Sequence, residues 1–329
     1  MNVGLIGYGY WGPKVARNLL QVKDCQLLRI ADINPARQKF AQVNLPETIT
    51  SSAAADVLYD EAIESVIISS YPSTHYTLAK QALEAGKHVL VEKPFSPTEK
   101  KGYELMNLAE KKGLTLMVDY TYLYSNAILE IKELLQSPGF EDLLFIEGNR
   151  SNFVWTRTGV NVLYDLASHD LSILLFLLGK MPVKVRAISH AFHKEVEQVV
   201  QVFLTFPNGC NASLYCSWIS PNKVRSINFI GAQKTITFND LATDNKVEVL
   251  ENNKTAYLTG SDKLLDAEVK KTSLYIKQDE PLFSMVSDFR NCVRNKTIPR
   301  SSMYLGLDVV RILEKAAYSM QQGGIEVNI

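Results

Sequence analysis

The sequence predicts an α/β protein: a doubly wound parallel sheet comes first, and an α+β domain with a largely antiparallel open sheet follows. Up to about residue 120, short runs rich in Val, Ile and Leu alternate with helical stretches, as in βαβ units covered on both faces. A glycine-rich turn, GYGYWG at 7–12, stands between the first run and the first helix. From 183 to about 271 strand patterns dominate instead. We therefore expect two domains, over 1–121 and 122–329.

The expected elements of the first domain alternate without interruption. Its strands are predicted at 3–6, 25–31, 65–69, 87–93 and 114–120, and its helices at 13–20, 35–43, 74–85 and 97–112. The second domain is expected to begin with a helix over 126–136, a strand over 143–149 and a strongly apolar helix over about 163–178. Two hairpins follow at 199–218 and 224–240, which turn at 207–209 and near 231–233. Helices over 281–294 and 303–321 close the chain.

Composition excludes several classes of function. The 329 residues carry 35 Lys plus Arg and 35 Asp plus Glu, so the formal net charge is zero and no nucleic-acid surface is expected. No apolar run reaches the length of about 20 residues that spans a membrane, and no signal peptide precedes the first strand. The four cysteines have neither CxxC spacing nor His partners at zinc-ligand intervals. We therefore expect free thiols, no metal and a cytoplasmic protein.

The glycine turn has the context of a Rossmann dinucleotide site. Gly7 permits the tight turn, Gly9 lets the backbone approach a pyrophosphate, and Gly12 allows close packing of helix on strand. Asp32 ends the second strand, at the spacing of an acid that binds the adenosine ribose. Because Asp32 would repel a 2′-phosphate, NAD is favoured over NADP, although Arg37 could soften that preference. A turn without a ligand and an S-adenosylmethionine site are the alternatives.

Two further motifs carry chemistry. Glu92 and Lys93 end a parallel strand at the edge that faces the ligand crevice, and Pro94 restricts Lys93 to an extended conformation. A solvated loop lysine is the alternative. Asp165 and His169 are four residues apart on an apolar helix and would share one face. Histidine is suited to proton transfer near neutral pH, and a purely structural Asp–His hydrogen bond is the alternative here.

Several other residues are candidates through their position beside these motifs. His75 has the alternative of a structural partner, and Arg150 that of a surface ion pair. The candidates that would border the cofactor are Tyr10, Trp11, Ser70, Tyr71, Pro72 and His75. The candidates for the substrate pocket are Tyr122, Arg150, Asn152 and Trp155.

Four stretches, in this order, resemble the glucose–fructose oxidoreductase/inositol dehydrogenase (Gfo/Idh/MocA) family over nearly the whole chain. They are GYGYWG at 7–12 with AD at 31–32, SSYPSTHYTLAKQALEAGKHVLVEKP at 69–94, VLYDLASHDLSILLFLLG at 162–179 and SSMYLGLDVVRILEKAAYSMQQGG at 301–324. GYGYWGP together with DLASHDLSILL is similar to members that act on nucleotide-linked sugars. Ser168 before His169, and PFS after Lys93, depart from the commoner family pattern.

The resemblance implies a hydride transfer between NAD(H) and a secondary hydroxyl or keto group of a sugar, cyclitol or nucleotide-linked sugar. It assigns catalysis to Lys93, which polarises the substrate oxygen, and to His169, the general acid/base. Asp165 and His169 would contact the substrate. The alternatives are an NADP-dependent reductase of a non-sugar carbonyl in the same fold and a non-catalytic NAD(H)-binding sensor. The resemblance also implies a homodimer or homotetramer formed through the C-terminal sheet.

Overall fold

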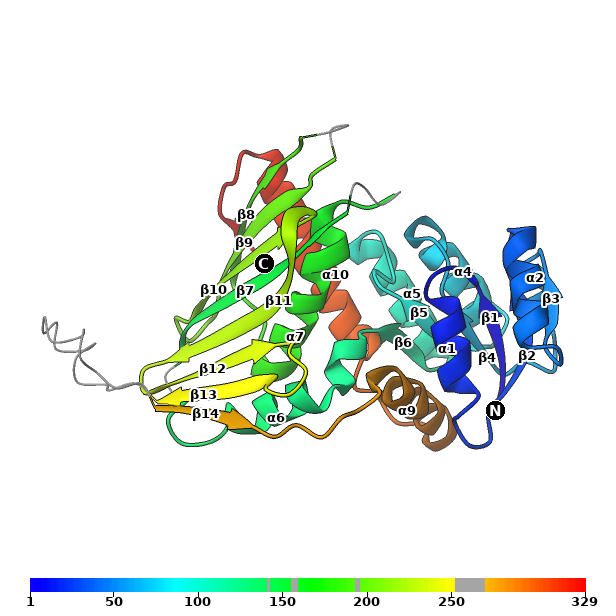
Figure 1. Cartoon of the computed structure of the whole chain (residues 1–329). Helices are drawn as coiled ribbons and strands as arrows, with labels where there is room; N and C mark the ends of the chain where they lie inside the picture. The colour runs from blue at the N-terminus through cyan, green and yellow to red at the C-terminus, as the bar shows by residue number, and fades with distance from the viewer. Residues whose placement is uncertain (141–142, 155–158, 193–195, 252–269) are drawn as a thin grey trace, which may run out of the picture. The chain divides into compact units, whose positions relative to one another are not determined.

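The computed structural model of the chain describes residues 1–140, 143–154, 159–192, 196–251 and 270–329 (Figure 1). The chain forms two compact units. Unit 1 contains Met1–Tyr124 and Glu280–Arg311, and unit 2 contains Ser125–Asp279 and Ile312–Ile329. The division expected from the sequence kept 122–329 together, whereas in the structure residues 280–311 belong to unit 1.

Unit 1 is built on a parallel sheet of six strands in the order β3-β2-β1-β4-β5-β6. The order reverses between β1 and β4, so the crevice of this fold opens at the carboxyl ends of these two strands. All four residues of β4 are buried, as expected for a strand covered on both faces. The strands are β1 (Asn2–Ile6), β2 (Gln26–Ala31), β3 (Ile49–Ser51), β4 (Ser65–Ile68), β5 (His88–Glu92) and β6 (Leu116–Asp119).

Local signals start and end the helices of unit 1. The Asn34 side chain caps α2 by accepting from the Ala36 amide, and the Thr98 hydroxyl caps α5 by accepting from the Lys101 amide. Gly113 ends α5 in the left-handed conformation. The helices are α1 (Gly12–Leu19), α2 (Pro35–Asn44), α3 (Ala55–Leu58), α4 (Pro72–Glu84), α5 (Glu99–Lys112), η1 (Thr121–Tyr124) and α9 (Pro281–Asn295); α10 (Met303–Gln321) begins in unit 1 and ends in unit 2.

The segment that returns to unit 1 is tied to the end of β6. Helix α9 packs against α1 and η1. The Tyr124 hydroxyl donates to Asp288 of α9 at 2.6 Å and accepts from the Ser301 amide at 3.2 Å. The Val118 amide donates to the Ser301 carbonyl at 3.0 Å. These bonds explain why a C-terminal segment completes the N-terminal unit.

Unit 2 is a sheet of nine strands in the order β14-β13-β12-β11-β7-β10-β9-β8-β15. Both predicted hairpins are present, as the antiparallel pairs β9–β10 and β11–β12. Strands β7 and β10 pair in parallel within this otherwise antiparallel sheet. The strands are β7 (Leu143–Phe153), β8 (Lys184–His190), β9 (Val199–Thr205), β10 (Asn211–Ser217), β11 (Ile219–Gly231), β12 (Lys234–Asn239), β13 (Val247–Glu251), β14 (Lys270–Leu274) and β15 (Val327–Asn328).

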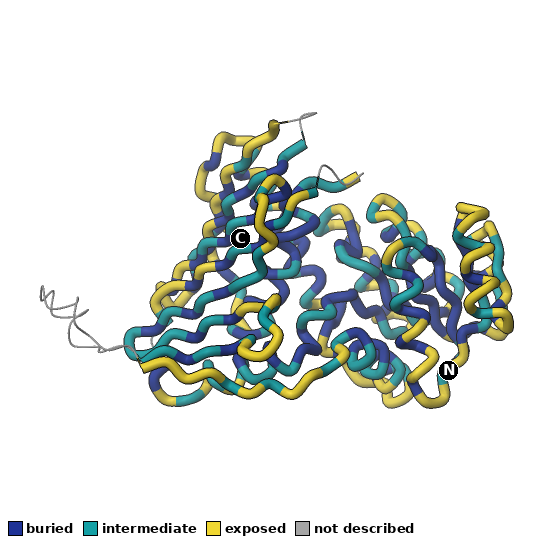
Figure 2. Tube along the Cα trace, viewed as in Figure 1, coloured by how far each residue is buried: buried dark blue, intermediate teal, exposed yellow. Residues whose placement is uncertain are grey.

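The two faces of this sheet differ in what covers them. Helices α6 (Asn126–Leu134) and α7 (Ser168–Leu178) lie on one face, where alternate residues of β9 such as Val202 are fully buried (Figures 1 and 2). On the other face the intervening residues are more open, and Phe203 is 39% exposed. A π-helical turn, η2 (Leu163–Ala167), precedes α7. Among all described helices, none has the length and apolar character needed to cross a membrane.

Candidate functional site

The glycine turn is closely packed against its own surroundings. Gly7 has a φ of +96°, and a Cβ on it would lie 2.5 Å from the Ser69 carbonyl oxygen. A Cβ on Gly12 would lie 2.4 Å from the Gly7 carbonyl oxygen. Only glycine therefore fits at these two positions, and α1 starts directly against the end of β1. This is the close approach of backbone that a pyrophosphate cradle requires.

Asp32 is bonded to the same turn. Its Oδ2 accepts from the Tyr8 amide at 2.6 Å and its Oδ1 accepts from the Asn34 amide at 2.8 Å. The Nη1 atom of Arg37 lies 3.7 Å from Asp32 Oδ2, and the same atom would be 3.2 Å from a Cβ on Gly9. The Arg37 side chain is 39% exposed. A carboxylate and a guanidinium thus stand together at the end of β2, beside the second glycine of the turn.

Four of the predicted cofactor residues follow β4, of which Ser70 and Tyr71 lie in the loop and Pro72 and His75 lie in the first turn of α4. The Ser70 hydroxyl shares a hydrogen bond with the Thr74 hydroxyl at 2.7 Å. Tyr71 is 53% exposed and directly precedes α4, whose first residue is Pro72. This loop borders the crevice because it follows β4 at the point where the strand order reverses.

His75 connects the loops after β4 and β5. Its Nδ1 lies 2.9 Å from the Pro94 carbonyl oxygen, and its Nε2 lies 3.1 Å from the Ser70 carbonyl oxygen. Burial lowers the pKa of His75, while the contacts with the two carbonyl oxygens act in the opposite direction. The contacts of this side chain are those of a structural partner that holds the segment beside Lys93.

Carboxyl groups meet at the ends of β5 and β6. Glu92 and Asp119 are register partners in the last positions of these strands. Burial, the nearby Asp119 carboxylate and a hydrogen bond with it raise the pKa of Glu92 well above its ordinary value of 4.5. Asp119 also accepts from the Trp11 indole Nε1 at 2.7 Å and from the Thr121 hydroxyl. Lys93 follows Glu92 and is half-buried.

Asp119 is not among the site residues predicted from the sequence. Its signal was present, since it ends a buried parallel strand adjacent to the one that ends in Glu92 and Lys93. Tyr122 directly follows Thr121, the hydroxyl partner of this cluster, in η1 and is half-buried. Unit 1 therefore gathers the glycine turn, Asp32, the loop after β4, Glu92 and Lys93 along one edge of its sheet.

Unit 2 carries the predicted Asp–His pair. Asp165 is buried within the π-helical turn, and its Oδ2 accepts from the Trp218 indole Nε1 at 3.1 Å. Trp218 directly follows β10 and is fully buried. His169 stands in the first turn of α7 and is half-buried. The predicted continuous helix is thus wound more widely around Asp165, a distortion that is frequent at functional sites.

Arg150 has a buried partner. Its Nε and Nη2 donate to Asp170 Oδ1 at 2.9 and 2.6 Å, and the two side chains are 4% and 2% exposed. The ion pair named as the alternative for Arg150 is present, but it lies in the interior and not at the surface. Asn152 follows on the same face of β7, and its Oδ1 is buried without a hydrogen bond from any described residue. Trp155 lies outside the described residues.

The described part of the chain holds no group of three or more His, Cys, Asp or Glu side chains that could bind a metal ion. The four cysteines are free. Burial raises the pKa of the Cys216 thiol well above its usual range, so this thiol is kept in its neutral form.

Two family models match the chain. One describes an oxidoreductase family with an NAD-binding Rossmann fold and covers residues 1–120, and the other describes the GFO/IDH/MocA C-terminal domain and covers residues 129–237. The chain belongs to the Gfo/Idh/MocA oxidoreductase family. The resemblance stated from the sequence motifs is thereby confirmed, as is the two-sheet α/β fold.

Named relatives in the family act on cyclitols and nucleotide sugars. The scyllo-inositol 2-dehydrogenase (NADP(+)) of Bacillus subtilis is 31% identical over 67% of this chain, and the alignment spans 64% of that relative, just under two thirds. The UDP-N-acetylglucosamine 3-dehydrogenase of Acidithiobacillus ferrooxidans is 30% identical over 66% of this chain and 67% of its own length. A solved structure of that dehydrogenase has the same fold, with a TM-score of 0.84 at 22% identity over 98% of both chains.

Proposed function

We propose that this protein is an NAD(H)-dependent dehydrogenase that transfers a hydride between nicotinamide and a secondary hydroxyl or keto group of a sugar, cyclitol or nucleotide-linked sugar. One observation carries the proposal. The glycine turn lies where the strand order reverses and is hydrogen-bonded to Asp32 at the end of β2, and Lys93 lies at the same edge of the sheet. Family membership supports an oxidoreductase, and the two named relatives support a polyhydroxylated substrate.

Side chains of the protein transfer the proton, stabilise charge and bind the substrate. A bound dinucleotide supplies the hydride chemistry. His169 takes the hydroxyl proton at its imidazole during oxidation and returns it during reduction. The Lys93 ammonium stabilises the charge that develops on the substrate oxygen. Asp165, held by Trp218, orients His169 or binds a substrate hydroxyl. Tyr122 and the side-chain carbonyl of Asn152, which accepts no hydrogen bond from a described residue, are the further substrate contacts, whereas the Arg150 guanidinium is paired with Asp170.

NAD is the proposed cofactor, because the Asp32 carboxylate stands where a 2′-phosphate would be repelled. The second candidate is NADP, which is favoured by the exposed Arg37 guanidinium beside Asp32 and by the NADP(+) in the name of the Bacillus subtilis relative. Calorimetric titration of the purified protein with NAD⁺ and with NADP⁺ separates the two. Tighter binding of NAD⁺ is expected, and a clear preference for NADP⁺ would overturn the cofactor assignment.

The substrate class is tested by turnover. A panel of UDP- and dTDP-linked sugars and of inositols is incubated with the preferred dinucleotide, and formation of the reduced cofactor is followed by absorbance. Turnover with one of these compounds is expected. Binding of the cofactor without turnover of any compound, in either direction, would instead favour the non-catalytic sensor.

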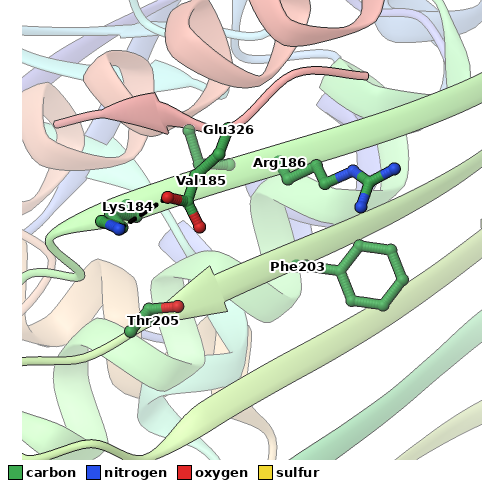
Figure 3. Close-up of a pocket in the computed structure, with 6 residues that line it drawn as sticks. All are labelled: Lys184, Val185, Arg186, Phe203, Thr205 and Glu326. Carbon is green, nitrogen blue, oxygen red and sulfur yellow. Dashed lines mark hydrogen bonds and ion pairs between the residues drawn. The ribbon is translucent and has the colours of Figure 1, made fainter. Parts of the chain in front are cut away.

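Self-association through the open face of the unit 2 sheet belongs to the same proposal. Phe145, Ile188 and Phe203 are 36%, 38% and 39% exposed there. A shallow pocket on this face is lined by polar and apolar side chains, and within it Lys184 Nζ lies 2.6 Å from Glu326 Oε1 (Figure 3). Mixed apolar and charged surface of this kind suits an interface between copies. The free cysteines support a reducing compartment, and hence the cytoplasm.

A further inference from the structure

The aromatic pair of the glycine turn has an arrangement that the proposed function does not explain. The Tyr10 and Trp11 rings stack, with centroids 6.5 Å apart and planes 22° apart. Lys14 Nζ lies 3.7 Å from the centre of the Tyr10 ring and 4.9 Å from that of the Trp11 ring. Tyr10 is 81% exposed, whereas Trp11 is half-buried and its indole N–H is bonded to Asp119. The orientation of the Trp11 ring is therefore set by a hydrogen bond at its indole N–H as well as by packing.

The direction of Trp11 across the sheet is set by this bond. Its backbone follows β1, and its indole reaches the carboxyl end of β6, which is the last strand on the β4 side of the sheet. Asp32 lies on the opposite side, at the end of β2. In a doubly wound sheet the two mononucleotide halves of a dinucleotide occupy the two sides of the strand-order reversal. With Asp32 on the adenosine side, the Trp11 ring is on the nicotinamide side.

The anchor itself is held from three directions. Asp119 accepts from Trp11 and from Thr121 through different oxygens, and its register partner Glu92 shares a further hydrogen bond with it. Asp119 is only 5% exposed, so these bonds are sheltered from water. A sheltered hydrogen bond whose acceptor is itself held by two neighbours fixes the orientation of the Trp11 indole.

We propose that Asp119 is a positioning residue of the cofactor site, which holds the Trp11 indole at the carboxyl end of β6 so that the ring forms a wall of the pocket for the nicotinamide half. This inference rests on the proposed function. It predicts that the hydrogen bond between Trp11 and Asp119 strengthens binding of the nicotinamide half of the dinucleotide and has no effect on binding of the adenosine half.

The test compares two ligands on three variants. Trp11→Phe keeps an aromatic ring but removes its N–H, Asp119→Ala removes the acceptor, and the double variant removes both. Dissociation constants are measured for NAD⁺ and for ADP-ribose, which has the same adenosine and pyrophosphate without the nicotinamide. Thr48→Val is the matched control, because it removes a buried hydrogen bond of unit 1, to the Leu27 carbonyl, at the start of β2.

The expected result is that each single variant weakens NAD⁺ binding about tenfold and the double variant no further, because both mutations break the same bond. The affinity for ADP-ribose stays within about twofold of the wild-type value in all variants. Thr48→Val changes the affinity for neither ligand. Equal losses for both ligands, no loss for NAD⁺, or losses that multiply in the double variant would overturn the proposal.

The melting temperature of each variant shows whether it folds. If Asp119→Ala does not fold, Trp11→Phe alone decides the question. The proposed function fails by a different result, namely a wild-type protein that binds NAD⁺ but turns over no substrate. In that case the comparison of NAD⁺ with ADP-ribose still decides the role of Trp11.

Discussion

Lys93 and His169 carry the charge and the proton of the proposed reaction, and they belong to different units of the chain. We expect Lys93→Ala and His169→Asn to bind NAD⁺ normally and to lose most of their turnover. Loss of a general base costs about 10²–10⁴-fold, and loss of one electrostatic donor costs about 10²–10³-fold. Steady-state kinetics and calorimetry on each variant check this. A kcat near the wild-type value in either variant would show that its assigned role is wrong.

Glu92 makes stability depend on pH. A carboxyl with a raised pKa in the folded chain stabilises the fold below its unfolded pKa, and this stability is lost as pH rises through the folded pKa. The raised pKa of Glu92 therefore predicts a falling melting temperature as pH rises from its ordinary value of 4.5. Glu92→Gln, which still donates to Asp119, should flatten that fall above the ordinary value of 4.5. Parallel melting curves for Glu92→Gln, wild type and the exposed control Glu61→Gln would contradict this.

At the scale of elements, the contact of α1 with β1 depends on Gly12. Alanine there would place Cβ 2.4 Å from the Gly7 carbonyl oxygen. We expect Gly12→Ala to lose about 1–3 kcal/mol of unfolding free energy and most of its affinity for NAD⁺. Gly113→Ala is the control, because Gly113 ends α5 with a φ of +64° and open space around it. That variant should cost about 1–2 kcal/mol and keep its affinity, as measured by denaturant unfolding and titration.

Elements with a clear period were predictable from the sequence. The strands and helices of unit 1 up to residue 120 and both hairpins of unit 2 were found close to their expected limits. Strand β3 and helix α3 were missed, because three or four residues are too few to display a period. The π-helical turn was missed because Asp165 and His169 fit an α-helical spacing equally well.

Contacts between distant segments were the least predictable part of the candidate site. Trp218 is 53 residues from Asp165 in the sequence, and no sequence pattern near Trp218 predicts the hydrogen bond between them. Asp119 is 108 residues from Trp11, although its place at a strand end was visible. Motif spacing indicates which residues belong to a site, whereas the side chains that orient them depend on tertiary packing.

At the scale of the whole molecule, the open sheet face predicts assembly. We expect Phe203→Glu to reduce the mass of the particle in solution, because a charge within the contact would be desolvated without a partner. Light scattering after size-exclusion chromatography measures this. Val43→Glu, on the exposed side of α2 in unit 1 and 72% exposed in the wild type, is the control. Equal masses for wild type, Phe203→Glu and Val43→Glu would rule out assembly through this face.

The return of residues 280–311 to unit 1 has a consequence for biosynthesis. Met1–Tyr124 leaves the ribosome long before α9 and Ser301 do. Tyr124 therefore lacks its hydrogen-bond partner Asp288 while all of unit 2 up to Asp279 is being made. We expect a fragment of residues 1–121 to be unstable, and one that joins 1–124 to 280–311 through a flexible linker to unfold cooperatively, as circular dichroism melting can show. Nascent unit 1 thus stays incomplete until residues 280–311 have been made, after all of unit 2 up to Asp279 has left the ribosome.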